Sequence, residues 1–153
     1  MGGNGQAMRL PPHDVEAEQA VIGSLLIDQD AIAAIRERLE PDDFYVERHT
    51  HIYRAAITLA DRGEPIDTLT LRSQLESTQS LKRAGGIDYI AEMSLVVPTS
   101  ASVRHYADIV AAHALRRRLI KAGADVASLG FDLSLTTEAA LDGAEQSVFN
   151  ISD

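Results

Sequence analysis

The chain has 153 residues, of which 45% are hydrophobic and 24% are charged, a composition that is typical of a globular domain and excludes both a disordered chain and a membrane protein. Its formal net charge of −9 repels a phosphate backbone at long range, so the surface as a whole is not that of a nucleic-acid-binding protein. The absence of Cys excludes disulfides, thiolate metal sites and Cys nucleophiles, and together with the lack of a signal sequence or an apolar spanning run it predicts a cytoplasmic protein.

The N-terminus combines an irregular lead-in with the start of a helix. Residues 1–12 hold three Gly and two Pro without hydrophobic periodicity, which predicts a flexible tail. Apolar residues then recur at helical spacing, and Asp14 stands where an N-cap residue is expected. Glu16 and Glu18 lie in the first turn, where the helix dipole favours negative charge. The sequence therefore predicts an extended arm that leads directly into an amphipathic helix.

Four shorter helices are expected next, and most of them end at residues that stop helices. Pro41 stops the first, Gly63 has the position of a C-terminal cap after the second, and Pro98 ends the last. No run of alternating apolar and polar residues supports a strand. An all-α fold with a compact helical head is the resulting prediction. The four helices are expected over residues 30–39, 47–62, 71–77 and 87–95, and the head over residues 13–98.

The longest helical pattern covers residues 101–130, where no Pro occurs. At ~1.5 Å per residue this helix is roughly 45 Å long, against a radius of gyration near ~15 Å for a compact domain of this size. It carries two apolar stripes. A final helix has Leu141, Ala144, Val148 and Ile151 at 3,4,3 spacing, so it can fold back as a hairpin over residues 99–153.

The second stripe of the long helix then lacks a partner within the hairpin. An apolar face left over on a projecting hairpin predicts self-association, because a closed dimer or ring covers it. The alternative is that the head domain covers this stripe. The residues expected at an interface with another copy or a partner are Leu115, Arg116, Arg117, Leu119, Ala122, Val126, Leu129, Leu141 and Val148.

The same helix contains the one basic cluster of the chain, Arg116 to Arg118 with Lys121. Consecutive helical residues are ~100° apart, so at most two of the arginines share a face with Lys121. Aromatic residues, on which single-stranded bases would stack, do not interleave with them. A solvated face with salt bridges and a phosphate contact are therefore equally good interpretations, and a stand-alone module that binds single-stranded nucleic acid remains an alternative function.

Motifs for catalysis, cofactors and metals are not found. A P-loop needs Gly before its Lys, and neither Lys82 nor Lys121 follows Gly. His49 and His51 are two positions apart and would point to opposite helix faces, so they cannot chelate one ion; we expect His49 to be half-buried and His51 exposed. No nucleophilic triad or carboxylate pair is specified by spacing. We predict no catalytic, cofactor or metal residue, although a small acidic hydrolase stays an alternative.

Several ordered landmarks together resemble one family, the N-terminal domain of the hexameric bacterial replicative DNA helicases (DnaB family). The resemblance extends over residues 10–151. One departure is Ser102, where the family usually has Asn; both residues can cap the long helix. The matching landmarks are Pro11-Pro12, Glu16-Ala17-Glu18, Phe44-Tyr45, His49, Ile52-Tyr53, Gly63, Pro65-Ile66-Asp67, Gly85-Gly86, Tyr106-Ala107 and Leu115-Arg116-Arg117.

The resemblance implies a helical head and a helical hairpin, with hairpins pairing between subunits to build a collar on the helicase ring. The copies would form a dimer, or a hexameric ring as a trimer of dimers. Members of the family dock primase on this collar, and a helicase loader is a further candidate partner. The collar also helps to guide the excluded strand.

A larger departure is that family members continue through a linker helix into a RecA-like ATPase domain, which holds the P-loop, ATP, Mg²⁺ and the main DNA-binding loops. The present sequence contains none of those motifs. We therefore expect a non-catalytic piece of an ATP-dependent DNA helicase, without a cofactor of its own, that ends at the start of that linker. DNA would be bound mainly through the other domain, and no membrane is expected as a partner.

Overall fold

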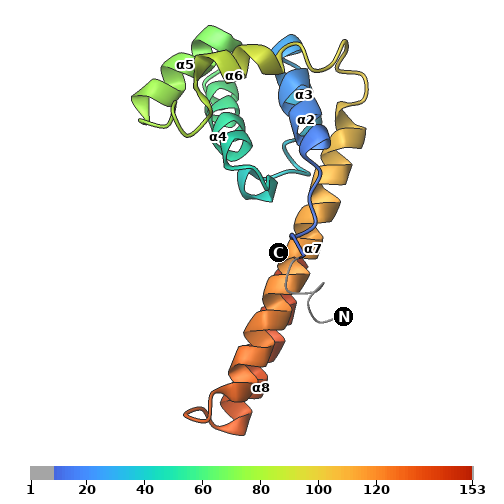
Figure 1. Ribbon diagram of the computed structural model, residues 1–153, viewed down its shortest axis with the longest axis vertical. Helices are drawn as coiled ribbons and strands as arrows, with labels where there is room; N and C mark the ends of the chain where they lie inside the picture. Colours follow the sequence, from blue (N-terminus) through green and yellow to red (C-terminus); the bar gives the residue numbers. More distant parts are fainter. Residues whose placement is uncertain (1–8, 153) are drawn as a thin grey trace. The chain divides into compact units, whose positions relative to one another are not determined.

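The structure, a computed structural model, describes residues 9–152, and within this range every regular element is a helix. The predicted all-α fold class is confirmed (Figure 1). The chain divides into two compact units. We call His13–Ala112 the head, and residues 113–152 together with residues 9–12 the hairpin. Most of the predicted flexible tail, residues 1–8, lies outside the described residues.

The head begins with helix α2 (Val15–Ile27), as predicted. Asp14 is its N-cap, since the Asp14 carboxylate accepts a hydrogen bond of 2.9 Å from the backbone N–H of Ala17. The next predicted helix is shorter than expected, and only α3 (Ala31–Ile35) forms, before the 3-10 turn η1 (Pro41–Asp43). After α3 the chain tightens, because the Arg38 N–H donates to the Ile35 carbonyl three residues back at 2.9 Å; beyond this turn the buried Tyr53 hydroxyl donates to the Leu39 carbonyl at 2.8 Å.

Three further helices complete the layer around the core: α4 (Glu47–Asp61), α5 (Thr68–Ser77) and α6 (Gly86–Met93). Gly63 follows α4 with φ of 69°, as expected for a C-terminal cap. Helix α5 begins three residues earlier than predicted. The Asp67 carboxylate accepts from the Thr70 N–H at 2.8 Å and the Thr70 hydroxyl accepts from the Asp67 N–H at 2.9 Å, so a capping box supports the extra turn.

The long helix α7 (Val103–Phe131) is continuous, as predicted. Its first part belongs to the head, where Val103, Ala107 and Val110 are buried in the core. These residues join the large apolar side chains of α2 and α4 in one cluster. The largest fully buried apolar members of this cluster are Ile22, Leu25, Ile35, Leu39, Ile52, Tyr53, Leu59, Leu71, Leu75 and Ile90.

The rest of α7 forms the hairpin with α8 (Thr137–Phe149) and the short 3-10 turn η2 (Asn150–Ser152). Thr136 caps α8, because its hydroxyl accepts from the Ala139 N–H at 3.1 Å. Helix α8 returns alongside α7 (Figure 1). The two helices touch closely, since a Cβ atom added at Gly143 would lie 3.0 Å from Leu129 Cδ1. The predicted fold-back is thus present.

Candidate assembly interface

The face of α8 that packs on α7 is made of small residues. Ala140, Gly143, Ala144 and Ser147 are half-buried there, at spacings of three, one and three residues. Small side chains let two helices approach closely, as the Gly143 contact shows. This inner face is the part of α8 for which large apolar residues had been expected.

Two of the four residues expected to pack on α7 therefore remain exposed. Ala144 and Ile151 are half-buried, but Leu141 is 60% exposed and Val148 is 58% exposed. Each residue turns a helix by ~100°, so an error of one position in the contact face changes which side chains reach the partner helix. Large apolar residues of α8, Leu141, Val148 and Phe149, are left exposed.

The apolar stripe of α7 is divided between two environments. Ala122 is buried, Val126 and Leu129 are half-buried, and all three lie on the side of α8. These three residues have a partner within the hairpin, contrary to the expectation that the whole stripe lacks one. Leu115 and Leu119 are exposed, the latter at 51%. The unpartnered part of the stripe is therefore its N-terminal half.

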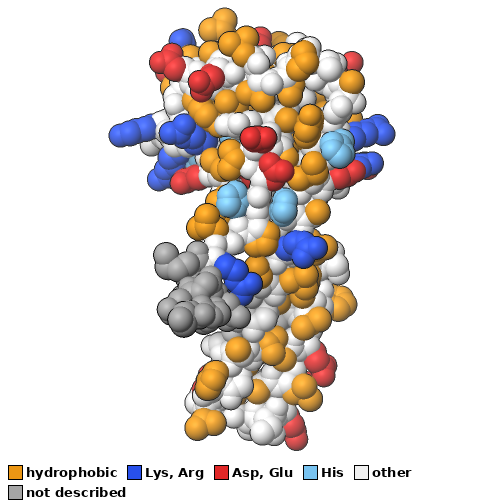
Figure 2. Space-filling model, turned by 45° about the vertical axis from the view of Figure 1, so that its right-hand side comes forward, with side chains coloured by type: hydrophobic (Ala, Val, Ile, Leu, Met, Phe, Trp, Pro, Cys, Tyr) orange, Lys and Arg blue, Asp and Glu red, His pale blue; other side chains and the backbone are white. Residues whose placement is uncertain are grey.

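The hairpin exposes an unusual amount of large apolar surface, which Figure 2 shows as hydrophobic side chains along it. One open groove between α7 and α8 has a volume of about 460 Å³, and Glu145 is the only charged residue that lines it. Val126, Ala144, Val148 and Phe149 form the rest of its lining. Exposed apolar side chains of the hairpin are Leu10, Leu115, Leu119, Ile120, Phe131, Leu133, Leu135, Leu141, Val148 and Phe149.

The basic cluster makes contacts within the hairpin. Arg117 Nη1 donates to the Pro12 carbonyl at 2.7 Å, and Arg118 Nε donates to the Ile151 carbonyl at 3.0 Å. Lys121 Nζ lies 2.8 Å from Asp125 Oδ2. Arg116 is exposed. Arg117 and Arg118 thus bind the chain segments around Pro12 and Ile151 to α7. These contacts explain the two arginines without a phosphate ligand.

The head contains a buried polar cluster that the sequence did not reveal. Glu18 is 1% exposed and is not a solvated first-turn residue. Its carboxylate accepts from the backbone N–H groups of Tyr45 at 2.8 Å and Val46 at 3.2 Å. It also lies 2.8 Å from His49 Nδ1. One signal could have indicated this burial, because Glu18 lies three and four residues before the core residues Val21 and Ile22.

His49 links Glu18 to another helix. Its Nε2 atom lies 2.6 Å from the Tyr89 hydroxyl on α6, and its side chain is fully buried rather than half-buried as expected. Glu18, His49 and Tyr89 therefore connect α2, α4 and α6 through satisfied hydrogen bonds. His51, which was expected to be exposed, is half-buried and lies 3.3 Å from Glu47. No group of three His, Asp or Glu within residues 9–152 is arranged to hold a metal ion.

The head matches a known family. The DnaB-like helicase N terminal domain family matches residues 10–112, which is the range that contains the buried Glu18 and His49 cluster. The chain belongs to this family. The resemblance inferred from the sequence landmarks is confirmed.

Relatives of the DnaB family are similar over most of this chain. The replicative DNA helicase DnaC of Bacillus subtilis is 40% identical over 143 residues, which are 94% of this chain and 32% of that protein. The replicative DNA helicase DnaB of Geobacillus stearothermophilus is 38% identical over 144 residues, again 94% of this chain and 32% of that protein. The chain thus spans about a third of the length of the curated relatives that it matches.

Solved structures of the DnaB family share the fold. The crystal structure of the N-terminal domain of DnaB helicase from Mycobacterium tuberculosis has a TM-score of 0.88 and 39% identity, and the match covers 93% of this chain and 99% of that one. A structure described as a DnaB-like replicative helicase and its interactions with primase has a TM-score of 0.75 over 91% of this chain and 31% of that one, at 21% identity. In the described part of the present chain, no helix is long and apolar enough to cross a membrane.

Proposed function

We propose that this chain is the non-catalytic collar domain of a hexameric, ATP-dependent replicative DNA helicase, and that it mediates ring assembly and primase docking. The observation that carries the proposal is the exposed apolar surface of the hairpin in a chain of the DnaB-like helicase N terminal domain family. The named relatives are replicative DNA helicases, and this chain corresponds to about a third of their length.

Ring assembly is assigned to the outer face of the hairpin. Leu119, Leu141 and Val148 are each more than half exposed. Covering their apolar surface with a second copy would favour association by about 25 cal/mol for every Å² removed from water. A twofold pair is the simplest closed arrangement, because the same face serves both copies. This contact would form a dimer, and three such dimers would form a hexameric ring. Leu115 and Arg116 lie near Leu119 along α7 and complete the proposed contact.

Primase docking rests on family membership and on the similar fold of a helicase whose structure is described with its interactions with primase. A helicase loader is a further candidate partner. We assign ATP, Mg²⁺ and most DNA contacts to the two thirds of the relatives that lie outside the matched range. In this chain Lys82 and Lys121 do not follow Gly, so no P-loop is formed. A role in DNA replication predicts a cytoplasmic protein.

Light scattering after size exclusion tests the assembly role, with Leu119→Asp as the variant. The wild-type chain at high micromolar concentration should form a dimer or a larger oligomer. Leu119→Asp should be monomeric with its helicity largely unchanged, because an unpaired charge in an apolar interface is costly. Leu95→Asp changes an exposed apolar residue of the head and should leave the oligomer intact. A strictly monomeric wild-type chain that also fails to bind primase would refute the proposal, and unfolding of Leu119→Asp would place Leu119 in the core.

A stand-alone module for single-stranded nucleic acid makes a different prediction. It requires affinity for a single-stranded oligonucleotide that falls steeply with salt and is lost in Arg116→Glu. Arg116 is the suitable position because it is exposed, whereas Arg117 and Arg118 donate to backbone carbonyls. Such a result would replace the collar proposal by the nucleic-acid module.

A further inference from the structure

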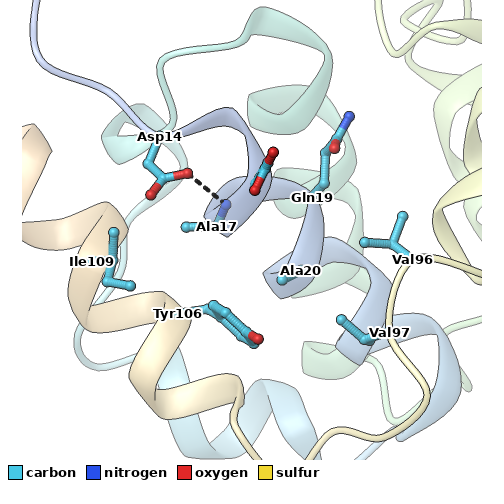
Figure 3. A pocket seen from close by; sticks show the side chains of 9 residues that line it. Asp14, Ala17, Gln19, Ala20, Val96, Val97, Tyr106 and Ile109 are labelled. Carbon is cyan, nitrogen blue, oxygen red and sulfur yellow. Dashed lines mark hydrogen bonds between the residues drawn. The ribbon is translucent and has the colours of Figure 1, made fainter.

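The head has a groove at the edge of its core. It has a volume of about 380 Å³ and lies between α2, the start of α7 and the loop that joins α6 to α7. Figure 3 shows its side chains from these three segments facing a common hollow. Small residues of α2 form one side, and larger apolar residues form the others. The lining consists of Asp14, Glu16, Ala17, Gln19, Ala20, Val96, Val97, Tyr106 and Ile109.

The apolar part of the groove suits side chains that enter between helices. Ala17 and Ala20 are one turn apart on α2 and are buried at the floor of the groove, while Tyr106 and Ile109 are one turn apart on α7 and half-buried. The Tyr106 hydroxyl makes no hydrogen bond with the residues that the structure describes. A ring that is largely apolar and carries one available hydroxyl is typical of residues that anchor a protein partner. A groove between helices with apolar walls can accept the apolar face of an amphipathic helix.

The charges around the groove favour an occupant of positive charge. Asp14 and Glu16 line it from the N-terminal end of α2, and none of the described residues that line the groove is basic. One oxygen of Asp14 caps α2, and Glu16 makes no ion pair or hydrogen bond within residues 9–152. The head as a whole holds 17 acidic and 9 basic residues, so its net charge is −8. An anionic segment would be repelled at a distance and again at the rim, whereas a cationic one is attracted at both.

We propose that this groove docks a cationic amphipathic helix of a partner protein, with apolar side chains over Ala17 and Ala20 and a Lys or Arg beside Glu16. The basic segment of this chain itself is a poorer occupant. Its Arg117 and Arg118 donate to carbonyls of the hairpin, and Lys121 pairs with Asp125. The proposal concerns the head alone and is independent of assembly through the hairpin.

A model peptide provides a direct probe. We would use an 18-residue helix of Leu and Lys with one Trp on its apolar face, and a matched peptide in which Glu replaces every Lys. The chain has no Trp, so Trp fluorescence reports only the peptide. The Lys peptide should bind saturably with a blue shift, and the methyl resonances of Ala17 and Ala20 should move. The Glu peptide should not bind. Absence of binding by the Lys peptide, or movement of methyls elsewhere only, would overturn the proposal.

Two pairs of variants separate docking from general attraction to an acidic surface. Val96 lines the groove and its neighbour Leu95 does not, yet both are exposed. Val96→Gln should lower the affinity for the Lys peptide by about fivefold or more, and Leu95→Gln should leave this affinity unchanged. Glu16→Lys should weaken binding by about tenfold. Glu37→Lys makes the same change of charge at an exposed position outside the groove, and it should weaken binding much less.

These variants should remain folded, because Glu16, Val96 and their controls are exposed, and circular dichroism checks this. Equal weakening by the control variants would show non-specific attraction and overturn the proposal. Loss of self-association in Val96→Gln, measured by light scattering, would show that a second copy occupies the groove and would also overturn it.

Discussion

The head and the hairpin use apolar residues in opposite ways. In the head, large residues such as Ile22 and Leu59 are buried, and the surface carries the excess negative charge. In the hairpin, small residues such as Gly143 and Ala144 make the contact between the helices, and Leu141 and Val148 remain exposed. The head thus supplies its own stability, whereas the hairpin keeps much of its apolar surface for a contact with another chain.

Polar contacts follow the same division. The head buries the Glu18 carboxylate and satisfies it with two backbone N–H groups and His49. The hairpin uses the exposed Arg118 and the half-buried Arg117 to hold carbonyl groups at its edge. A buried cluster is costly to disrupt, while exposed pairs contribute little. Substitutions in the two units should therefore differ in size as well as in consequence.

The largest effect is expected from Glu18→Ala in the head. It removes the acceptor of the Tyr45 and Val46 N–H groups and the partner of His49, and loss of one member of such a buried pair costs about 3–5 kcal/mol. Chemical denaturation gives the free energy of unfolding. Glu16→Ala removes an exposed carboxylate from the same helical turn and should cost less than about 1 kcal/mol. Equal losses for both variants would contradict a structural role for the buried cluster.

A comparison of Leu25→Ala with Val148→Ala tests the contrast directly. Leu25 is buried in the core of the head, so its truncation should cost about 2–5 kcal/mol in free energy of unfolding. Val148 is exposed, and at dilutions where the chain is monomeric its truncation should change stability by no more than about 0.5 kcal/mol. At high concentration only Val148→Ala should weaken self-association. A large loss for dilute Val148→Ala would show that Val148 supports the fold of the monomer.

Two glycines test the close contact within the hairpin. A Cβ atom at Gly143 would lie 3.0 Å from Leu129 Cδ1, whereas one at Gly123 would have no heavy atom of the described residues within 4 Å, apart from its chain neighbours and the adjacent backbone of α7. Gly143→Leu should therefore overpack the contact and cost about 1–3 kcal/mol. Gly123→Ala should stabilise α7 by about 0.5–1 kcal/mol, since Ala favours the helix. Hydrogen exchange of α7 and α8 amides measures both, and protection of α8 in Gly143→Leu equal to wild type would disprove the close packing.

The smallest effect is expected at Asp28. A hydrogen bond from the Ser100 hydroxyl, aided by the Asp30 N–H, lowers the pKa of Asp28. Because the folded-state pKa is lowered, its contribution to stability is present above the unfolded-state pKa and is lost as pH falls through the folded-state value. Ser100→Ala should raise the pKa of Asp28 toward its ordinary value and slightly weaken the acid dependence of stability. NMR titration of the carboxyl carbon measures the shift; an unchanged pKa would exclude Ser100 as its main cause.

Local signals predicted most helix boundaries, but not every one. Asp14 and Gly63 were interpreted correctly because a cap depends on residues adjacent in sequence. The start of α5 was placed too late because Asp67 and Thr70 form their capping box with an unusual Thr at its third position. Helix α3 was predicted too long, because periodicity does not show that the turn after Ile35 tightens to a hydrogen bond between the Arg38 N–H and the Ile35 carbonyl, three residues back.

By itself, the sequence determined the all-α fold, the long helix, the returning helix and the family, because all of these follow from helical periodicity, caps and ordered landmarks along the chain. Tertiary structure alone decided which face of α8 meets α7, and that Glu18 is buried against His49. The physical reason is that packing depends on the space available between two helices. A small residue such as Gly143 therefore makes the contact with α7, although hydrophobicity alone predicts Leu141 or Val148 in that position. Which apolar residues of the hairpin stay exposed, and are therefore available to a partner, is known only once the packed face of α8 is known.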